Sequence, residues 1–200
     1  RCVKYLPGQE PPAEALREEK RLGRDFFKEK LLTDAEFEFV RRAYAYDNER
    51  DLNARLVQEG ESVHWTRERV EYDAAYGQEQ AVAYLFLPRH VDPPYQTVIW
   101  WPAIWAVDAK AITPQQVENV AFLIRSGGAL VWPVYKGTYE RSVGPIRGAT
   151  ERWELQKQQV KDLRRAIDYV KTRNDLDAGA IGYYGLSWGA AKGAWALAIE

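Results

Sequence analysis

The sequence predicts an α/β fold built on a mostly parallel sheet, with helices on both of its faces. Two apolar runs without polar alternation, residues 97–101 and 129–132, are separated by a segment of helical periodicity. Such runs are typical of strands that are covered on both sides, and their alternation with helices indicates right-handed crossovers. Residues 67–72 and 81–87 come first and read as an antiparallel hairpin, with Gly77 at a turn.

Composition limits the classes of partner. The chain has 200 residues, of which 46% are hydrophobic and 28% charged, as in one ordinary globular domain. Its 28 basic and 29 acidic residues give a net charge of −1, which argues against nucleic acid as a partner. Cys2 is the only cysteine, so an internal disulfide is excluded, and we expect a reducing, cytoplasmic location. No apolar run approaches the roughly 18 residues of a membrane span.

The domain is expected to occupy residues 31–200. Residues 1–30 contain too few apolar side chains to form a core. A helix begins at a capping box formed by Thr33 and Glu36, and it is expected to end near Asp47. Residues 51–60 read as an extended connection. The remaining elements are expected in this order: the hairpin, strand 97–101, a helix opened by Thr113-Pro114 and closed at Gly127-Gly128, strand 129–132, a loop, helix 151–173, strand 181–184 and a final helix.

The last strand leads into Gly185-Leu-Ser187-Trp188-Gly189, which is followed by a helix of small residues. A strand, this motif and a helix in succession predict a nucleophile elbow, in which the two glycines let strand and helix pass closely. The turn would expose the Ser187 hydroxyl and aim the N–H of Trp188 at a developing oxyanion. The motif alone consists of common residues, so its flanking elements carry the prediction.

Several phrases resemble the α/β-hydrolase superfamily, on the side of dienelactone hydrolases, acetyl xylan esterases and prolyl-oligopeptidase-like enzymes. More narrowly, residues 33–200 resemble the C-terminal hydrolase domain of large bacterial proteins that also carry a serine/threonine protein kinase and a formylglycine-generating-enzyme-like domain. Arg1-Cys2-Val3 resembles the closing strand of that second domain, which implies that residues 1–30 are a linker and the tail of an upstream domain. The phrases are YDAAYG at 72–77, AYLFLP at 83–88, PPYQTV at 93–98, PVYKGTYER at 133–141 and YYGLSWG at 183–189.

The resemblance implies a serine hydrolase of ester or thioester bonds that needs no cofactor. Ser187 would be the nucleophile, and the oxyanion would be held by the N–H groups of Trp188 and of a residue near Ile104. Relatives tend to carry Pro-Gly where this chain has Pro102-Ala103. Because alanine resists positive φ, we expect a reshaped or weaker oxyanion hole.

The catalytic triad is incomplete in this sequence. In the superfamily the acid and then the histidine follow the serine, but the thirteen residues after Ser187 include Glu200 and no histidine. His64 falls in the antiparallel lead-in and His90 in a loop after a strand, so both are interpreted as structural or exposed. We therefore expect a C-terminally truncated piece, with its acid and base beyond Glu200, an open edge at residues 181–184 and almost no activity by itself.

Several other residues have two readings. The loop at residues 136–141 is either a pocket wall, with Lys136, Tyr139 or Arg141 on the substrate, or a solvated loop with an internal ion pair. Trp105 and Trp188 either line an acyl pocket or pack in the core. Asp162 and Asp168 are interpreted as surface charges. The spacing of acidic, cysteine and histidine residues predicts no metal site, and no phosphate-binding loop is present.

A second class of function stays open, namely a non-catalytic sensing or binding module attached to the kinase. A peptidase would need a lid or propeller domain that these residues do not supply. Partners predicted from the sequence are a small-molecule ester and the upstream domains of the same polypeptide.

Overall fold

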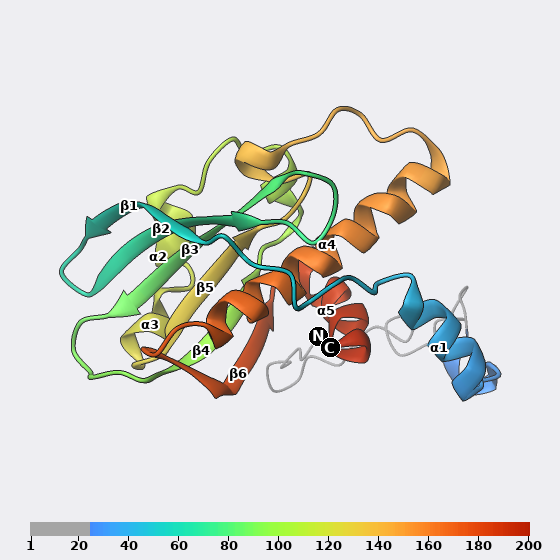
Figure 1. Cartoon of the computed structure of the whole chain (residues 1–200), viewed down its shortest axis with the longest axis horizontal. Helices are drawn as coiled ribbons and strands as arrows, with labels where there is room; N and C mark the ends of the chain where they lie inside the picture. The colour runs from blue at the N-terminus through green and yellow to red at the C-terminus, as the bar shows by residue number, and fades with distance from the viewer. Residues whose placement is uncertain (1–24) are drawn as a thin grey trace, which may run out of the picture.

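The computed structural model describes residues 25–200, so the predictions for residues 1–24 lie outside the described residues. Its centre is a six-stranded sheet (Figure 1) with strand order β1-β2-β3-β5-β4-β6. The strands are β1 (Arg55–Glu61), β2 (Trp65–Asp73), β3 (Gln80–Pro88), β4 (Tyr95–Trp101), β5 (Ala129–Val134) and β6 (Leu176–Gly185). The pairs β1–β2, β2–β3 and β3–β5 are antiparallel, whereas β4 is parallel to both β5 and β6. The predicted order, an antiparallel lead-in and then a parallel sheet, is confirmed.

Helices cover both faces of the sheet. They are α1 (Asp34–Arg42), α2 (Pro114–Glu118), α3 (Ala121–Arg125), α4 (Gly148–Lys171) and α5 (Trp188–Ile199), with short 3-10 helices η2 (Phe26–Lys28), η3 (Ile104–Val107) and η4 (Tyr139–Arg141). The core on one face contains residues of α4 and α5, and the core on the other contains residues of α2 and α3. Both predicted capping boxes, at Thr33 and Thr113, are present.

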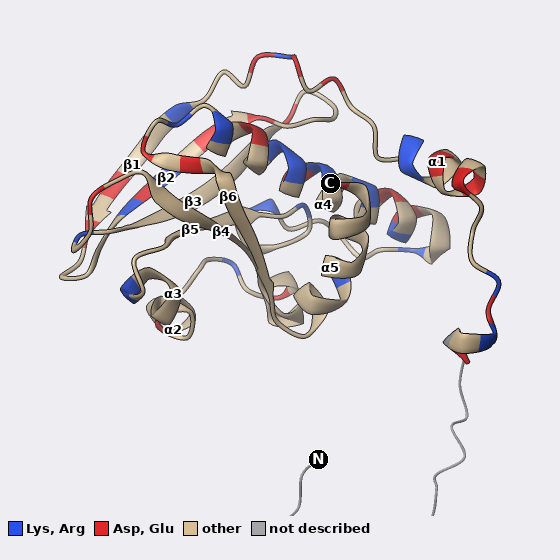
Figure 2. Ribbon diagram, turned by 90° about the horizontal axis from the view of Figure 1, so that it is seen from below, with Lys and Arg blue, Asp and Glu red and all other residues tan. Residues whose placement is uncertain are grey.

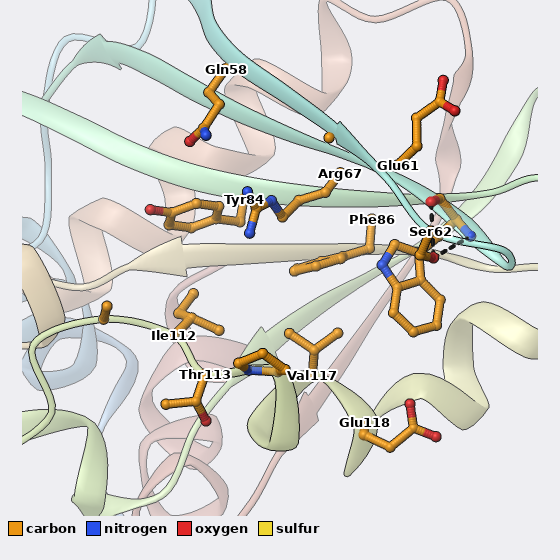
Figure 3. A pocket seen from close by; sticks show the side chains of 14 residues that line it. Gln58, Glu61, Ser62, Arg67, Tyr84, Phe86, Ile112, Thr113, Val117 and Glu118 are labelled. Atoms are coloured by element: carbon orange, nitrogen blue, oxygen red, sulfur yellow. Dashed lines mark hydrogen bonds between the residues drawn. The ribbon is translucent and has the colours of Figure 1, made fainter.

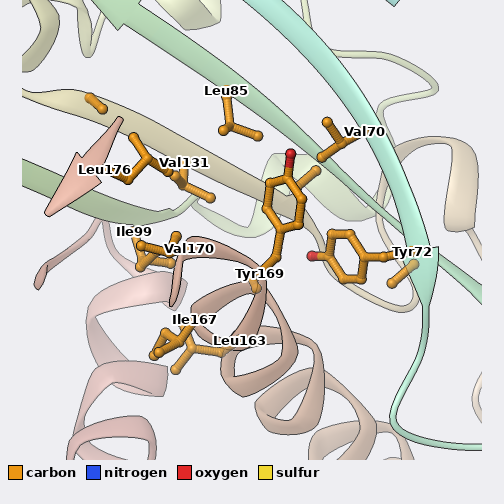
Figure 4. Close-up of a cluster of buried hydrophobic side chains, with 14 of the residues drawn as sticks. Val70, Tyr72, Leu85, Ile99, Val131, Leu163, Ile167, Tyr169, Val170 and Leu176 are labelled. Carbon is orange, nitrogen blue, oxygen red and sulfur yellow. The ribbon is translucent and has the colours of Figure 1, made fainter. Parts of the chain in front are cut away.

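The larger core lies between α4 and the sheet (Figure 4). Leu163, Ile167 and Val170 of α4 pack there against residues of β3, β4 and β5. Tyr169 of α4 stacks on Tyr72 of β2, with ring centroids 5.5 Å apart. These buried side chains recur every three or four residues along α4, which is the spacing from which the helix was predicted.

The local structure differs from the prediction at three places. The extended connection expected at residues 51–60 contains the edge strand β1, which was not expected in the sheet because six of its seven residues are exposed. The helix expected between Thr113 and Gly127 is two helices, because Val120 leaves helical geometry at φ −118° and ψ 3°. The first helix ends at Arg42, well before Asp47.

On α4, Asp162 is buried and Asp168 is half-buried, contrary to the prediction that both are surface charges. The Asp162 side chain is 2% exposed and that of Asp168 15%. Asp168 accepts a hydrogen bond from Tyr46 at 2.7 Å. Arg165, 1% exposed, donates to the backbone oxygens of Arg50, Asp51 and Asp73 at 2.8–3.0 Å. These bonds give the buried guanidinium its partners and fix the segment before β1 against α4.

β6 forms the edge of the described sheet, as predicted for residues 181–184. Figure 2 shows charged residues along β1, β2 and α4, whereas β6 and α5 are nearly free of them. Their sequences contain one charged residue each, Asp177 and Lys192. Among the described residues, no helix combines the length and apolar character needed to cross a membrane.

The open edge of β6 predicts self-association through strand pairing. Gly182 is exposed on this strand, and a side chain there would meet its nearest atoms, in Thr97 and Val98, at an ordinary 3.9 Å. We expect Gly182→Lys to lower the fraction of dimer and higher oligomers in sedimentation velocity, because an edge lysine opposes pairing. A wild-type chain that stays monomeric at high concentration would contradict this expectation.

Candidate active site

Ser187 lies between the end of β6 and the start of α5, in a backbone conformation that few residues adopt. Its φ is 53° and its ψ is −104°, and its side chain is exposed. A non-glycine residue held at such angles costs about 1–3 kcal/mol and is found mainly at functional sites. The turn is held by a hydrogen bond from the Leu186 N–H to the Trp101 oxygen at 3.2 Å. The geometry is therefore that of the predicted nucleophile elbow.

The two glycines of the motif are required by close backbone contacts. A Cβ atom on Gly189 would overlap the carbonyl oxygen of Trp101, and one on Gly185 would lie 2.6 Å from the carbonyl carbon of Gly189. Gly193, one turn further along α5, faces the ring of Tyr183, whose hydroxyl donates to the Gly189 oxygen at 2.5 Å. Small residues thus let α5 rest directly on the ends of β4 and β6.

Trp101, the last residue of β4, joins the elbow to the core. Its ring stacks on Tyr135 at a centroid distance of 3.8 Å and meets the ring of Trp188 edge-on at 5.8 Å. The Tyr135 hydroxyl donates to the Trp100 oxygen at 3.1 Å. The aromatic contacts therefore fix the position of the first residue of α5 relative to the end of β4, and this fixes the position of Ser187.

Two backbone N–H groups are candidates for the oxyanion hole. Trp188 is the first residue of α5, and Ile104 is the first residue of η3. Within residues 25–200 neither N–H donates a hydrogen bond to the backbone or to a side chain. Free N–H groups at the start of a helix are suited to stabilising negative charge. Ile104 and Trp188 line one cavity, so both predicted oxyanion donors lie beside the same space.

The expected distortion at Pro102-Ala103 is absent. Ala103 has φ −75° and ψ 176°, an extended conformation open to any residue. Alanine in place of glycine therefore gives no reason for a weaker oxyanion hole.

The cavity beside the elbow has a volume of about 560 Å³, within the range of small-molecule sites. Apolar side chains of η3, α4 and the loop before α4 form much of its wall. The charged residues on it are Asp108, Lys110, Arg152 and Lys192. None of these four forms an ion pair with another described residue, so the cavity has an excess of positive charge.

Lys192 is the half-buried one among these cations. Its Nζ lies 5.4 Å from the ring centroid of Trp188 and 3.3 Å from Oε1 of Gln156. Burial lowers the pKa of Lys192 to about 8, because the ammonium is partly removed from water. Sequence reasoning missed this residue, since a lysine on a helix is usually solvated.

A buried ion pair fixes the loop after β5. Arg141, 8% exposed, meets Asp162 at 2.8 Å. Asp162 also accepts from the Tyr76 hydroxyl at 2.8 Å and from the Lys136 N–H at 2.7 Å. Burial raises the pKa of Asp162, while Arg141 and the hydrogen bonds act in the opposite direction. The Gly137 and Ser142 portions of this loop line the cavity, so the buried pair sets one of its walls.

The side chains predicted to contact substrate on this loop are held elsewhere. Lys136 Nζ pairs with Glu79 at 2.5 Å, and the Lys136 oxygen accepts from Gln159 at 2.9 Å. Tyr139 is fully buried, 6.1 Å from the ring of Trp132, and its burial raises its pKa. Trp105 packs against the core on the α2 face. The two predicted oxyanion donors, Ile104 and Trp188, line the cavity. The residues predicted to contact substrate do not line it, namely Lys136, Tyr139, Arg141 and Trp105.

The two histidines lie at the other end of the sheet. His64 is in the turn before β2, whose first residue, Trp65, pairs with Pro88 at the end of β3. Because β3 runs antiparallel to β5, this end lies beside the starts of the parallel strands, whereas the elbow follows their ends. His64 and His90 line a separate pocket, roughly 20 Å of strand away from Ser187. In residues 25–200, no cluster of three acidic, cysteine or histidine residues could hold a metal.

Comparison with known proteins gives structural matches only, since no family model and no curated protein matches the sequence. An acetyl xylan esterase from a Paenibacillus species is similar with a TM-score of 0.62 and 24% identity, over 86% of this chain and 57% of that one. A putative acetyl xylan esterase from Bacteroides fragilis has a TM-score of 0.61 at 11% identity, with 83% and 50% covered. A glucuronoyl esterase from Solibacter usitatus has a TM-score of 0.57 at 15% identity, with 82% and 54% covered.

These matches establish an α/β-hydrolase-like fold with an open sheet. The chain spans about half the length of these solved structures.

Gly189→Ala should destabilise the protein by about 2 kcal/mol or more, because its methyl group would overlap the Trp101 oxygen. Urea unfolding measures the effect. Gly182→Ala is the matched control, since its methyl group would meet nothing closer than 3.9 Å, and we expect a change within about 0.5 kcal/mol. Equal stabilities of the two variants would show that the close crossing is not required.

The lowered pKa of Lys192 predicts a pH dependence of stability. Between the folded value of about 8 and the ordinary value of 10.5, the unfolded chain holds the proton more tightly, so this lysine makes stability rise with pH. Lys192→Met should therefore gain stability over wild type most at pH 7 and lose that advantage towards pH 10.5. Urea unfolding across this range measures it, with Lys110→Met on the same cavity as control. A Lys192→Met difference that is constant with pH would refute the assignment.

Proposed function

We propose that this chain carries the nucleophile and oxyanion donors of a serine hydrolase that cleaves ester bonds through an acyl-enzyme. One observation carries the proposal: Ser187 is held at positive φ between a strand and a helix, and the next residue, Trp188, lines a cavity together with Ile104. Among the described residues, the backbone N–H groups of Trp188 and Ile104 are both free. The names of the structurally similar proteins are those of esterases, which favours esters over thioesters among the predicted substrates.

The chemistry follows from this placement. The Ser187 oxygen would attack the acyl carbon as its proton passes to a base, and the carbonyl oxygen would take up negative charge between the N–H groups of Trp188 and Ile104. The alcohol would leave with a proton returned by the base. Water, deprotonated by the same base, would then attack the acyl-enzyme and release the carboxylic acid and free Ser187.

The base is the missing part of this mechanism. His64 and His90 line a pocket at the opposite end of the sheet, so neither serves Ser187. We propose that a histidine and its orienting carboxylate come from outside these 200 residues, and that the chain by itself hydrolyses esters very slowly.

The setting of the domain is proposed from the sequence resemblance alone. Residues 1–30 would connect it to an upstream formylglycine-generating-enzyme-like domain and to a serine/threonine protein kinase, in a bacterial cytoplasmic protein. The upstream domains are then its partners within one polypeptide.

A second candidate is a sensing or binding module that keeps this fold without turnover. The placement of both histidines far from Ser187 favours it. Such a module would use the cavity beside the elbow for a ligand, and it would leave Ser187 unreactive.

Labelling with a fluorophosphonate probe tests the hydrolase against the module. In the full-length protein we expect labelling that Ser187→Ala abolishes, because the probe reacts with activated serines. Ser142→Ala is the control, since Ser142 lines the same cavity away from the elbow. The isolated 200-residue chain should show little labelling.

Two results would decide otherwise. Full-length protein that is not labelled at Ser187 would support the binding module. Substantial esterase turnover by the purified 200-residue chain would overturn the proposal that the base lies outside it.

A further inference from the structure

A second cavity lies between the β1–β2 hairpin and the segment that leads into α2 (Figure 3). Its volume is about 500 Å³, and it shares no lining residue with the cavity beside Ser187. It lies on the α2 face of the sheet, and residues 111–118, which include the start of α2, contribute one of its walls. We call it the hairpin cavity and define it by Gly60, Trp65, Arg67, Tyr84, Phe86 and Ile112 of its lining.

Arg67 is the central residue of this cavity. In the strand register it stands directly opposite Gly60 of β1 and Phe86 of β3. A Cβ atom on Gly60 would lie 3.6 Å from Nη2 of Arg67, so the guanidinium lies across the bare backbone of that glycine. Figure 3 shows the Arg67 side chain extending past Phe86 toward Tyr84.

Arg67 is half-buried and has no partner in the part of the chain that the structure describes. It forms neither an ion pair nor a hydrogen bond there, whereas its neighbours Arg55 and Arg69 both contact Glu71 at 2.6 Å. Removing a guanidinium partly from water costs free energy, which pairing with a carboxylate usually offsets. Arg67 has no such carboxylate among the described residues.

The two carboxylates on the hairpin cavity are already used. Glu61 pairs with Arg89 at 3.1 Å, and Glu118 pairs with Arg125 at 2.5 Å. Both of these arginines lie outside the cavity lining. Arg67 is therefore the charged side chain of this cavity that is free to pair with a ligand. Its positive charge favours an anionic ligand.

The rest of the wall is suited to a ring. Trp65, Tyr84 and Phe86 line the cavity, and the rings of Trp65 and Phe86 meet edge-on at 6.4 Å. Aromatic surfaces bind flat or apolar rings, and the planar guanidinium binds a carboxylate through two parallel hydrogen bonds.

We propose that the hairpin cavity binds small carboxylates that carry a ring, with Arg67 on the carboxylate and the aromatic side chains on the ring. This site is independent of the function proposed for Ser187, because it lies toward the other end of the sheet and uses none of the same residues.

Amide NMR with three matched probes tests the proposal: phenylacetate, its neutral counterpart phenylacetamide, and acetate, which lacks the ring. We expect phenylacetate to shift the backbone signals of Gly60 and Ile112 and to bind more tightly than either of the other two. Arg67→Gln should raise its Kd roughly tenfold or more, because a charge-assisted, two-bond contact is lost. Arg55→Gln, on the neighbouring strand and outside the cavity, should leave the Kd unchanged.

Arg67→Lys keeps the charge without the planar fork, and its Kd should fall between those of wild type and Arg67→Gln. Unchanged amide signals far from the cavity show that each variant is folded. The proposal is overturned if phenylacetamide binds as tightly as phenylacetate, or if Arg67→Gln binds phenylacetate like wild type. It is also overturned if the shifted signals belong to Gly137 and Lys192 at the other cavity, or if no signal shifts.

Discussion

The contact on which the active-site geometry depends is the crossing of α5 over the end of β4, where Gly189 rests on the carbonyl oxygen of Trp101. No side chain fits between the two backbones. The crossing sets the angle at which the chain leaves β6, and this angle places Ser187 in a conformation that the residue would not adopt alone. The strain is held by the aromatic packing around Trp101 and by the hydrogen bond from Tyr183. Reactive geometry at the surface thus depends on close packing beneath it.

The two ends of the sheet carry different chemistry. At the ends of the parallel strands, free N–H groups and unpaired cations surround a cavity next to a serine. Toward the other end, an unpaired arginine and aromatic rings surround the hairpin cavity. Both cavities favour negative charge although the chain has a net charge of −1. Most carboxylates in the described residues are instead engaged in ion pairs and hydrogen bonds, such as that of Asp162 with Arg141. The distribution of charge, and not its sum, decides what each cavity attracts.

Features that depend on a local requirement for one residue type were predictable from the sequence. Gly185 and Gly189 predicted the elbow, and Thr33 and Thr113 predicted helix starts, because each residue type meets one local requirement. Features that depend on distant partners were not. Asp162 looks like a solvated helix residue until the loop after β5 folds over it, and β1 looks like an extended connection because an edge strand needs no apolar face. Tyr139 was expected either on a pocket wall or in a solvated loop, but it is buried and packs against Trp132.

The pairing of β4 with β6 has a consequence for synthesis of the chain. Among the described strands β6 is made after all the others, yet its partner β4 is made much earlier, before β5 and the whole of α4. During that interval the apolar run at residues 97–101 can pair on its β5 side alone. Contacts between such distant segments form slowly and leave hydrophobic edges open to other chains. The free edge of β4 is therefore exposed while α4 is being made, and Ser187 acquires its geometry only after β6 has paired with β4.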